Sequence, residues 1–282
     1  MPRMPSDRDP GVAHSEAPSE PDLEPLKPTI TLVLPAYNEE ARIGSALDEL
    51  FGYLRRGGQA REGGRSALDM GTVEVLVVDD GSTDRTAEIV SARQQVNGGA
   101  HANLQLLKRP HLGKGGAVQA GMLEAQCDYI CFADADLATP PDQLPLLTDA
   151  LARHDIAVGS RVQPDGTDRR KTQPLHRRML GKVFHGLAAA WVTGPVPDTQ
   201  CGFKGFRRDA AHDLFARQEI GGIVFDAEII HLARKRGYSI AIVPVQWSDK
   251  RGSRMHVRPS LALRVVYDLF RIPLIHRRVP RR

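Results

Sequence analysis

The chain has 282 residues, of which 41% are hydrophobic and 26% are charged, and these proportions exclude a collagen-like, coiled-coil or wholly disordered protein. At roughly 150 residues per domain, the length allows one large domain or two modest ones. The net charge of +4 is unevenly distributed. Residues 250–282 contain ten Lys and Arg residues and one acidic residue, Asp268, so they carry +9 and the rest of the chain carries −5. This basic end favours contact with an anionic partner.

The sequence gives no sign of export or of insertion into a bilayer. No stretch resembles a signal peptide, and no apolar run approaches the roughly 18 residues that cross a membrane. The three cysteines, Cys127, Cys131 and Cys201, cannot pair completely and lack the usual spacing of zinc ligands, so we expect reduced thiols. We therefore expect a cytoplasmic protein without a transmembrane helix, either soluble or held peripherally at the cytoplasmic face of a membrane.

Residues 1–28 are rich in Pro, Asp, Glu and Ser and have almost no large apolar side chains. Such a segment cannot bury enough surface to offset its ordering entropy, so we predict a disordered tail. From residue 29 onward, strand-like and helix-like patterns alternate, which predicts an α/β fold: a mostly parallel sheet flanked by helices, in a domain over 29–249. The expected strands are 29–34, 73–78, 104–107, 129–133 and 156–158, and the expected helices are 43–54, 82–96, 117–126 and 141–153.

The pattern loosens after residue 160. Residues 176–192 and 226–235 are helix-like, and residues 239–245 are strand-like. Residues 260–275 form an amphipathic pattern, with arginines on one face and Leu, Val and Phe on another. We expect residues 250–282 to be a basic mobile loop followed by this amphipathic helical segment, which either lies on an anionic membrane or packs on the domain.

Polar residues follow the predicted strands at the points where the strands end. Parallel strands share one carboxyl edge, and ligands bind beyond that edge in open α/β sheets. We therefore expect the functional site to be built from these segments. They are residues 35–39, 79–82, 113–116, 134–136 and 159–161.

Asp134 and Asp136 are the main candidates for a metal site. Two carboxylates with one residue between them repel each other, and they stay ionised together most easily beside a cation. Their oxygens suit Mg²⁺ or Mn²⁺, ions that usually keep substrate phosphates as further ligands. The alternative is that one aspartate caps the helix that begins near Pro141.

Lys114 lies between glycines, where both the backbone and the ammonium can approach an anion. The segment is not a Walker A loop, because Lys108 stands where that loop needs glycine and Gly115 where it needs Ser or Thr. Nor is it the dinucleotide fingerprint, which follows the first strand. ATPase and NAD-enzyme functions are therefore excluded. Residues 79–82, DDGS, either cap a helix or bind a base or ribose.

Six motifs occur in the order in which the inverting family 2 glycosyltransferases have them. They are PAYNE at 35–39, VVDDGSTDRT at 77–86, GKGGAVQAGM at 113–122, DADLATP at 134–140, GSR at 159–161 and DTQCGFKGFRR at 198–208. From about residue 28 to about residue 271 the chain resembles this family, whose members have the GT-A fold. It is most similar to the dolichyl- or polyprenyl-phosphate β-glucosyltransferases. Eukaryotic members of that branch carry an N-terminal membrane helix, where this sequence has a polar segment.

The resemblance implies a role for each matching residue. The implied nucleoside contacts are Pro35, Tyr37, Glu39, Val78 and Asp80. The implied metal and diphosphate ligands are Asp134, Asp136 and the backbone of Ala135. The implied phosphate contacts are Lys114, Arg161, Lys204 and Arg254. Asp198 would lie beside the reacting centre, where Asp136, Arg161 and Lys204 would also act, and Asp226 and Glu228 would line the acceptor side.

The implied reaction transfers a hexose, glucose, from a nucleoside diphosphate sugar, UDP-glucose, to dolichyl or polyprenyl phosphate, with Mg²⁺ or Mn²⁺ as cofactor. A phosphomonoester has its second pKa near ~6 and is largely dianionic at neutral pH, so Asp198 is expected to position groups rather than remove a proton. Two alternatives keep the site: GDP-mannose as the donor, or a soluble hydroxyl as the acceptor. Nucleic acid is not an expected partner, because aromatic residues are only 5% of the chain and no stacking motif occurs.

Overall fold

A computed structural model describes residues 27–56, 72–97, 102–163, 165, 186, 189–194, 196–248 and 259–282. The predicted disordered tail therefore lies almost entirely outside the described residues. Arg254 and the rest of the predicted basic loop before residue 259 also lie outside them. The division of the chain into tail, catalytic domain and basic end stays a prediction.

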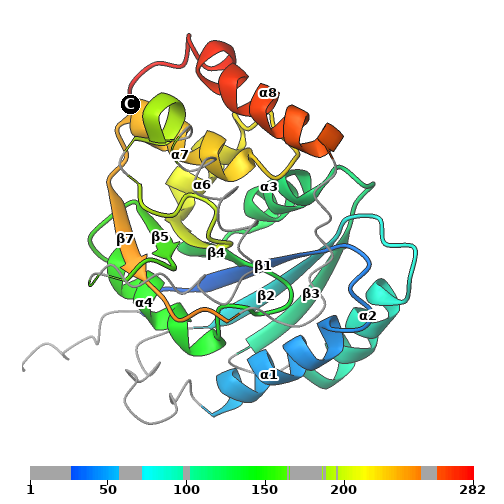
Figure 1. Cartoon of the computed structure of the whole chain (residues 1–282). Coiled ribbons are helices and arrows are strands. Elements are labelled where there is room, and N and C mark those ends of the chain that lie inside the picture. The colour runs from blue at the N-terminus through cyan, green and yellow to red at the C-terminus, as the bar shows by residue number, and fades with distance from the viewer. Residues whose placement is uncertain are drawn as a thin grey trace, which may run out of the picture.

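The fold is built on one seven-stranded sheet in the order β3-β2-β1-β4-β6-β5-β7 (Figure 1). All its strands run in the same direction except β6, which pairs antiparallel with both β4 and β5. The predicted α/β class with a mostly parallel sheet is confirmed. The strands are β1 (Ile30–Ala36), β2 (Val73–Asp79), β3 (Ala102–Lys108), β4 (Tyr129–Ala133), β5 (Ile156–Ser160), β6 (Phe203–Arg207) and β7 (Ile240–Pro244).

Strand β6 was not among the predicted strands. Its side chains alternate between the two faces of the sheet, with Phe203 in the core on one side and Phe206 in the core on the other. A lysine, Lys204, stands between them and is 1% exposed. A charged residue inside a strand hides the apolar run that marks a buried strand in the sequence.

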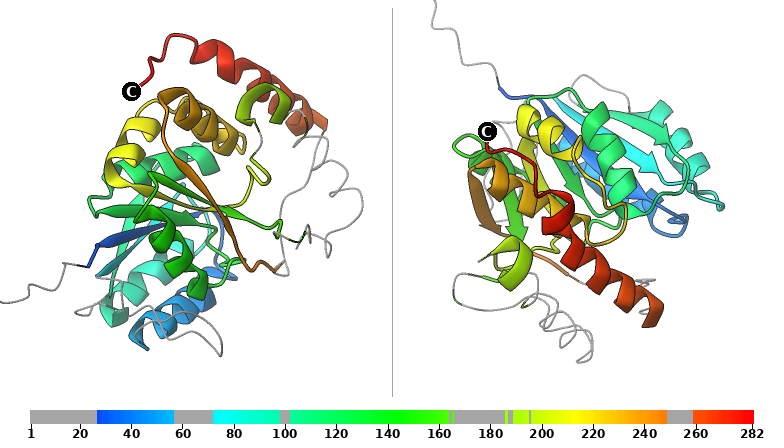
Figure 2. Two further views of the ribbon diagram at one scale, coloured as in Figure 1. Left: turned by 90° about the vertical axis from the view of Figure 1, so that its left-hand side faces the viewer. Right: turned by 90° about the horizontal axis from the view of Figure 1, so that it is seen from above.

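Helices cover both faces of the sheet (Figures 1 and 2). Helices α1, α2 and α4 lie on one face, and α3, α6 and α7 lie on the other, with α8 packed outside α7 as the outermost element. The helices are α1 (Ile43–Arg55), α2 (Thr86–Asn97), α3 (Lys114–Glu124), α4 (Leu144–Leu151), α6 (Arg208–Phe215), α7 (Phe225–Arg236) and α8 (Pro259–Ile275). Two short turns, the 3₁₀ turn η2 (Pro141–Gln143) and the π-helical turn η4 (Ala189–Thr193), complete the described helical structure.

Three predicted helix boundaries are wrong. The helix expected from residue 82 begins at Thr86, because Asp84 accepts a hydrogen bond from the Thr86 amide (2.9 Å) in the manner of a cap. The helix expected from residue 117 already begins at Lys114, after Gly113 with a φ of 87°. The helix expected over 141–153 is η2 followed by α4. Most of the helix expected over 176–192 lies outside the described residues.

The strands alternate their side chains between two buried cores. Leu32 and Leu34 of β1 pack in the core shared with α1 and α4, whereas Val33 between them packs in the core shared with α3 and α7. Because successive side chains of a strand point to opposite faces of the sheet, a strand can pack in both cores. Glycine is needed at Gly121 of α3, because a Cβ there would collide with Val33. The close contact holds α3, and with it the loop before α3, against the sheet.

All strands except β6 end at the same edge of the sheet, and β6 begins there. The segments after β1, β2, β3, β4 and β5 therefore converge on one edge. Among the helices that the structure describes, none combines the length and the apolar character that crossing a bilayer requires. The converging loops form the candidate site.

Candidate active site

The site is centred on the turn after β4. Asp134 donates its backbone N–H to the carbonyl of Gly202 (3.1 Å), and a Cβ at Gly202 would collide with the Asp134 carboxylate. Asp136 accepts a hydrogen bond from the Ala138 N–H at 3.1 Å. Leu137, which lies between Asp136 and Ala138, is buried and has a φ of 50°, a conformation that non-glycine residues rarely adopt. The turn thus holds both carboxylates at the edge of the sheet.

Each of the two carboxylates faces a cation. The Lys114 ammonium lies 2.6 Å from Asp134 Oδ1, and Arg42 Nη1 lies 3.5 Å from Asp136 Oδ2. Burial and the neighbouring charge of Asp134 raise the pKa of Asp136. Burial alone would lower the pKa of Lys114, but the charges of Asp134 and of Asp226 outweigh it and raise that pKa. The site is therefore a partly exposed cluster of alternating charges, in which Asp136 is harder to ionise than an ordinary aspartate.

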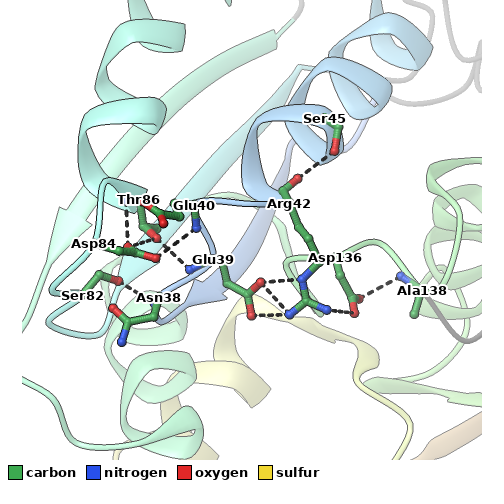
Figure 3. Close-up of polar contacts among 10 residues, drawn as sticks. All are labelled: Asn38, Glu39, Glu40, Arg42, Ser45, Ser82, Asp84, Thr86, Asp136 and Ala138. Carbon is green, nitrogen blue, oxygen red and sulfur yellow. Dashed lines mark hydrogen bonds and ion pairs between the residues drawn. The ribbon is translucent and has the colours of Figure 1, made fainter. Parts of the chain in front are cut away.

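Arg42, at the start of α1, joins two of the predicted motifs (Figure 3). Its Nε and Nη2 donate to the Glu39 carboxylate at 2.8 and 2.7 Å, while Nη1 points to Asp136. Nη1 is buried and makes no hydrogen bond within the described part of the chain. Sequence reasoning missed this residue. The signal that could have found it is its position three residues after Glu39 at a helix start, where opposite charges meet.

Hydrogen bonds connect the loops after β1 and β2 (Figure 3). The Asn38 N–H donates to Ser82 Oγ at 2.9 Å, and the Glu39 N–H donates to Thr86 Oγ1 at 2.7 Å. Asn38 has a φ of 52°, and its side-chain oxygen accepts from the Thr83 N–H at 2.8 Å. Ser82 and Thr86 thus hold the PAYNE segment, and Thr86 is also the first residue of α2.

Asp80 organises the loop before α3. Its two carboxylate oxygens accept from the N–H groups of Leu112 (2.8 Å) and Gly113 (3.0 Å), and the ring of His111 lies 2.8 Å away. That ring stacks on Tyr37 with centroids 4.1 Å apart, and Tyr37 is 42% exposed. Tyr37 and His111 thus form a partly exposed stacked pair beside the ends of β1 and β2, and the buried Asp80 carboxylate holds the His111 ring in place.

The remaining nucleoside candidates lie next to each other in the sheet. Pro35 of β1 is the register partner of Val78 of β2, one residue before the ends of these strands. Val78 is fully buried, so its contribution to the edge of the sheet is its backbone.

Arg161 and Lys204, the predicted phosphate contacts, are each engaged by a buried aspartate. Arg161 Nε and Nη2 donate to the two oxygens of Asp198, both at 2.7 Å. Burial alone would lower the pKa of Arg161, but the hydrogen bonds and charge of Asp198 raise it. Lys204 Nζ pairs with Asp226 Oδ1 at 2.5 Å and also donates to the Cys201 carbonyl. Burial raises the pKa of Asp226, and the charges of Lys204 and Lys114 act against that rise.

Glu228 is fully buried on α7. Its oxygens accept from the N–H groups of Glu219 and Ile220, both at 2.9 Å, and His276 Nε2 lies 2.7 Å from Oε1. The carboxylate therefore fixes the loop before α7 and the segment that follows α8. Of the two predicted acceptor-side residues, only Asp226 is connected to the central charges, through Lys204 and Lys114.

The structure brings Asp134, Asp136, Lys114 and Glu39 into one cluster, joined by Arg42. Arg254 lies outside the described residues. Among the residues that the structure describes, no group of three or more His, Cys, Asp and Glu side chains could hold a metal ion. A metal at Asp134 and Asp136 would therefore take its other ligands from substrate and water, which is the usual arrangement for Mg²⁺.

Solved structures with the same architecture define the class. The chain matches glucosyl-3-phosphoglycerate synthase of Mycobacterium tuberculosis in complex with UDP, with a TM-score of 0.57 and 21% identity over 87% of this chain and 80% of that one. The same enzyme with Mn²⁺, UDP-glucose and phosphoglyceric acid matches with a TM-score of 0.53 and 19% identity, over 87% and 81% of the two chains. The fold is thus of the GT-A type.

Sequence comparisons give the family. The model of "Glycosyl transferase family 2" matches residues 31–215. The dolichyl-phosphate beta-glucosyltransferase ALG5C of Trichomonas vaginalis is 37% identical over 90% of this chain and 74% of its own length. The human dolichyl-phosphate beta-glucosyltransferase is 32% identical over 80% of this chain and 69% of its own length. The chain belongs to glycosyl transferase family 2, as the motif order predicts.

Proposed function

We propose that the protein transfers glucose from UDP-glucose to dolichyl phosphate or a related polyprenyl phosphate, with inversion at the anomeric carbon. The observation that carries the proposal is the pair Asp134 and Asp136 at the carboxyl edge, each facing a cation. The names of the relatives support glucose as the sugar and dolichyl phosphate as the acceptor. We propose UDP as the nucleotide of the donor.

Asp134 and Asp136 would hold Mg²⁺ or Mn²⁺. Their oxygens are hard ligands, and the raised pKa of Asp136 reflects burial and an adjacent carboxylate, two costs that a bound cation offsets. When bound, the ion would neutralise the negative charge that develops on the departing diphosphate. Asp136 must lose its proton to take part, so binding is favoured as the pH rises through its raised pKa.

The residues after β1 and β2 would bind the nucleoside. Tyr37 offers an exposed ring, stacked on His111, on which a flat base can lie. Glu39 would accept a hydrogen bond from a ribose hydroxyl beside Arg42. Because the Asp80 oxygens already accept from two amides of the neighbouring loop, Asp80 would shape this pocket and meet the nucleoside at its edge. Pro35, Val78 and Ala135 would contribute backbone contacts.

Lys114 would contact the diphosphate directly. Its side chain is 32% exposed beside Asp134, so its ammonium can turn from the carboxylate to a phosphate oxygen. Arg161 and Lys204 are bound to buried aspartates, Asp198 and Asp226. We propose that these two cations act chiefly by adding positive potential near the reacting centre and by fixing their aspartates.

The acceptor needs little help from a base. A phosphate monoester is largely dianionic at neutral pH, because its second pKa is near ~6. Asp198 accepts three hydrogen bonds from Arg161, which favours a positioning role over proton removal. The oxygen of the acceptor phosphate would attack the anomeric carbon, and the bond from that carbon to the diphosphate would break. Asp226 would stand on this side, with Glu228 holding the loop behind it.

A transfer assay with purified protein tests the proposal. UDP-glucose, GDP-mannose and other nucleotide sugars are each offered with dolichyl phosphate, with a soluble phosphorylated acceptor or with a soluble sugar, in buffers with Mg²⁺, Mn²⁺ or a chelator. We expect glucosyl lipid from UDP-glucose only when a divalent ion is present. Faster transfer to a soluble acceptor than to dolichyl phosphate would show that the lipid is not the preferred acceptor. Equal transfer rates with chelator and with divalent ion would contradict the metal role. Location at the cytoplasmic face of a membrane stays a prediction.

A further inference from the structure

Helix α8 is apolar on two sides, although only one side packs on the protein. Leu269 and Ile272 are 1% and 0% exposed and lie in a cluster with residues of α7 and η4. A second set of apolar residues points outward, at spacings typical of one helix face. This set is Leu263, Val266, Tyr267, Phe270 and Leu274.

The outward set is highly exposed. Leu263, Tyr267 and Leu274 are 73%, 65% and 64% exposed, and no described segment covers them, because α8 is the outermost element (Figure 2). Trp191 of η4 extends the surface: it is 53% exposed, its ring lies 5.8 Å from that of Phe270, and its Nε1 donates to the Phe270 carbonyl at 3.3 Å. We call these five residues of α8 and Trp191 the outer stripe.

Basic residues border the outer stripe. The side chains of Arg264 and Arg271 are 78% and 36% exposed, and Arg277 and Arg278 are exposed just beyond the helix. The acidic residue of α8, Asp268, is 7% exposed and lies 3.8 Å from Arg264 and 3.6 Å from Arg271. The surface thus combines apolar and aromatic side chains with positive charge, while its carboxylate is turned inward.

This combination matches one kind of partner best. A second copy of the chain, docked through the same surface by a two-fold axis, would bring arginines of both copies together. A membrane with anionic lipids provides an apolar layer for the stripe and a negative layer for the arginines, and Trp and Tyr are enriched at that boundary. Because α8 is not a helix that can cross a bilayer, it would lie along the surface.

We propose that the outer stripe of α8 and η4 docks the protein on an anionic membrane surface, with α8 lying in the plane of the headgroups. This inference goes beyond the transfer reaction, and it rests on exposed side chains outside the candidate active site. Docking would bring the enzyme to the membrane in which a lipid-linked acceptor is found.

Vesicle flotation of the full chain tests the proposal. The vesicles contain phosphatidylcholine alone or with phosphatidylserine, and they contain no dolichyl phosphate, so that binding cannot come from the acceptor. We expect the protein to float with the anionic vesicles at low salt and to stay in solution with phosphatidylcholine alone. Leu263→Gln/Leu274→Gln should weaken binding roughly tenfold or more, because two exposed leucines lose their apolar contact.

Two matched controls separate docking from general surface effects. Ile242→Gln changes a residue that is 38% exposed on β7 and should float like the unaltered protein. Arg264→Gln/Arg278→Gln should weaken binding to anionic vesicles roughly thirtyfold, since each basic residue near the surface contributes about 1 kcal/mol. Arg56→Gln/Arg153→Gln removes the same charge from exposed positions elsewhere and should have a much smaller effect.

A second measurement does not depend on altering α8. Lipids with brominated acyl chains should quench the fluorescence of the protein, and Trp191→Phe should remove most of that quenching. Failure to float with anionic vesicles at low salt overturns the proposal, as does unchanged flotation of Leu263→Gln/Leu274→Gln. A dimer in solution that this double variant converts to a monomer would assign the stripe to a second copy instead. None of these readouts measures sugar transfer, so the docking and the reaction fail separately.

Discussion

Two groups of aspartates lie at the same edge of the sheet but in different surroundings. Asp198 and Asp226 are 2% and 3% exposed. Asp198 pairs with Arg161, whose side chain is 12% exposed, and Asp226 pairs with Lys204, which is 1% exposed. Asp134 and Asp136 are partly exposed, and they stand close enough for one to raise the pKa of the other. Each carboxylate of the first group has a strong ion pair inside the protein. In the second group Arg42 is shared between Asp136 and Glu39, so three carboxylates meet two cations and negative charge remains for a ligand.

The difference separates carboxylates that stabilise the fold from carboxylates that can bind a ligand. A buried pair costs several kcal/mol per ion to desolvate, and it recovers that cost only while both partners remain. A partly exposed carboxylate can exchange its partner for an ion or a phosphate group at lower cost. The comparison therefore assigns stability to Asp226 and ligand binding to Asp136, and it can be tested from both sides.

The largest expected effect comes from breaking a buried pair. Lys204→Met keeps most of the side-chain volume but leaves the Asp226 carboxylate buried beside an apolar group. We expect the free energy of unfolding to fall by roughly 3–5 kcal/mol, as measured by urea denaturation. Lys204→Met/Asp226→Asn leaves no unpaired charge and should recover most of the loss. If the double variant is no more stable than the single one, the charge is not what destabilises Lys204→Met.

The opposite result is expected at Asp136. Asp136→Asn keeps the shape of the side chain and its acceptor for the Ala138 N–H, so the free energy of unfolding should hardly change. Transfer should fall roughly a hundredfold or more, because a ligand of the cation is lost, and Mn²⁺ binding in the presence of UDP should weaken when measured by calorimetry. Asp209→Asn, at an exposed position on α6, is the matched control. Normal turnover by Asp136→Asn would remove this residue from the metal site.

Arg42→Gln sharpens the comparison through pH. Burial and Asp134 raise the pKa of Asp136, and the charge of Arg42 lowers it. Without Arg42 that pKa should rise further. Since activity needs the ionised carboxylate and is lost as the pH falls through its pKa, the acid side of the kcat/KM profile should move to higher pH.

At neutral pH we expect Arg42→Gln to lose roughly tenfold in kcat/KM, equivalent to about 1.4 kcal/mol. Arg55→Gln removes an arginine from the other end of α1 and should leave the profile in place. An unmoved acid limb in Arg42→Gln would mean that the residue serves only to hold Glu39.

The smallest effect is expected at an exposed pair. Asp48 and Arg93 join α1 to α2 at 3.0 Å, and the hydrogen bond from Arg93 lowers the pKa of Asp48. Asp48→Asn should cost less than about 1 kcal/mol at neutral pH and low salt. Because the folded pKa is depressed, the contribution is present above the unfolded pKa and is lost as the pH falls through the folded value. Unfolding curves at pH 7 and in acid, with and without salt, measure this; a larger loss that persists in acid would contradict the electrostatic cause.

The sequence predicted the half of the sheet around β1, β2 and β4 well. In that half, apolar strands alternate with helices, and both patterns are local. It failed at β6, whose Lys204 is acceptable in a buried strand only because Asp226, 22 residues away, compensates its charge. The same limit explains why Arg42 was missed: its guanidinium becomes part of the site only when the loops after β1 and β4 meet.

The amino-acid sequence by itself determined the fold class, the family and the edge of the sheet at which the site lies, because strand and helix periods and short motifs are encoded in neighbouring residues. Only the tertiary structure decided which cation pairs with which carboxylate. It also decided that Glu228 is enclosed and that α8 keeps an apolar face outward. Those outcomes depend on burial and on distances between residues far apart in the chain, and the strength of a charge interaction is set by both.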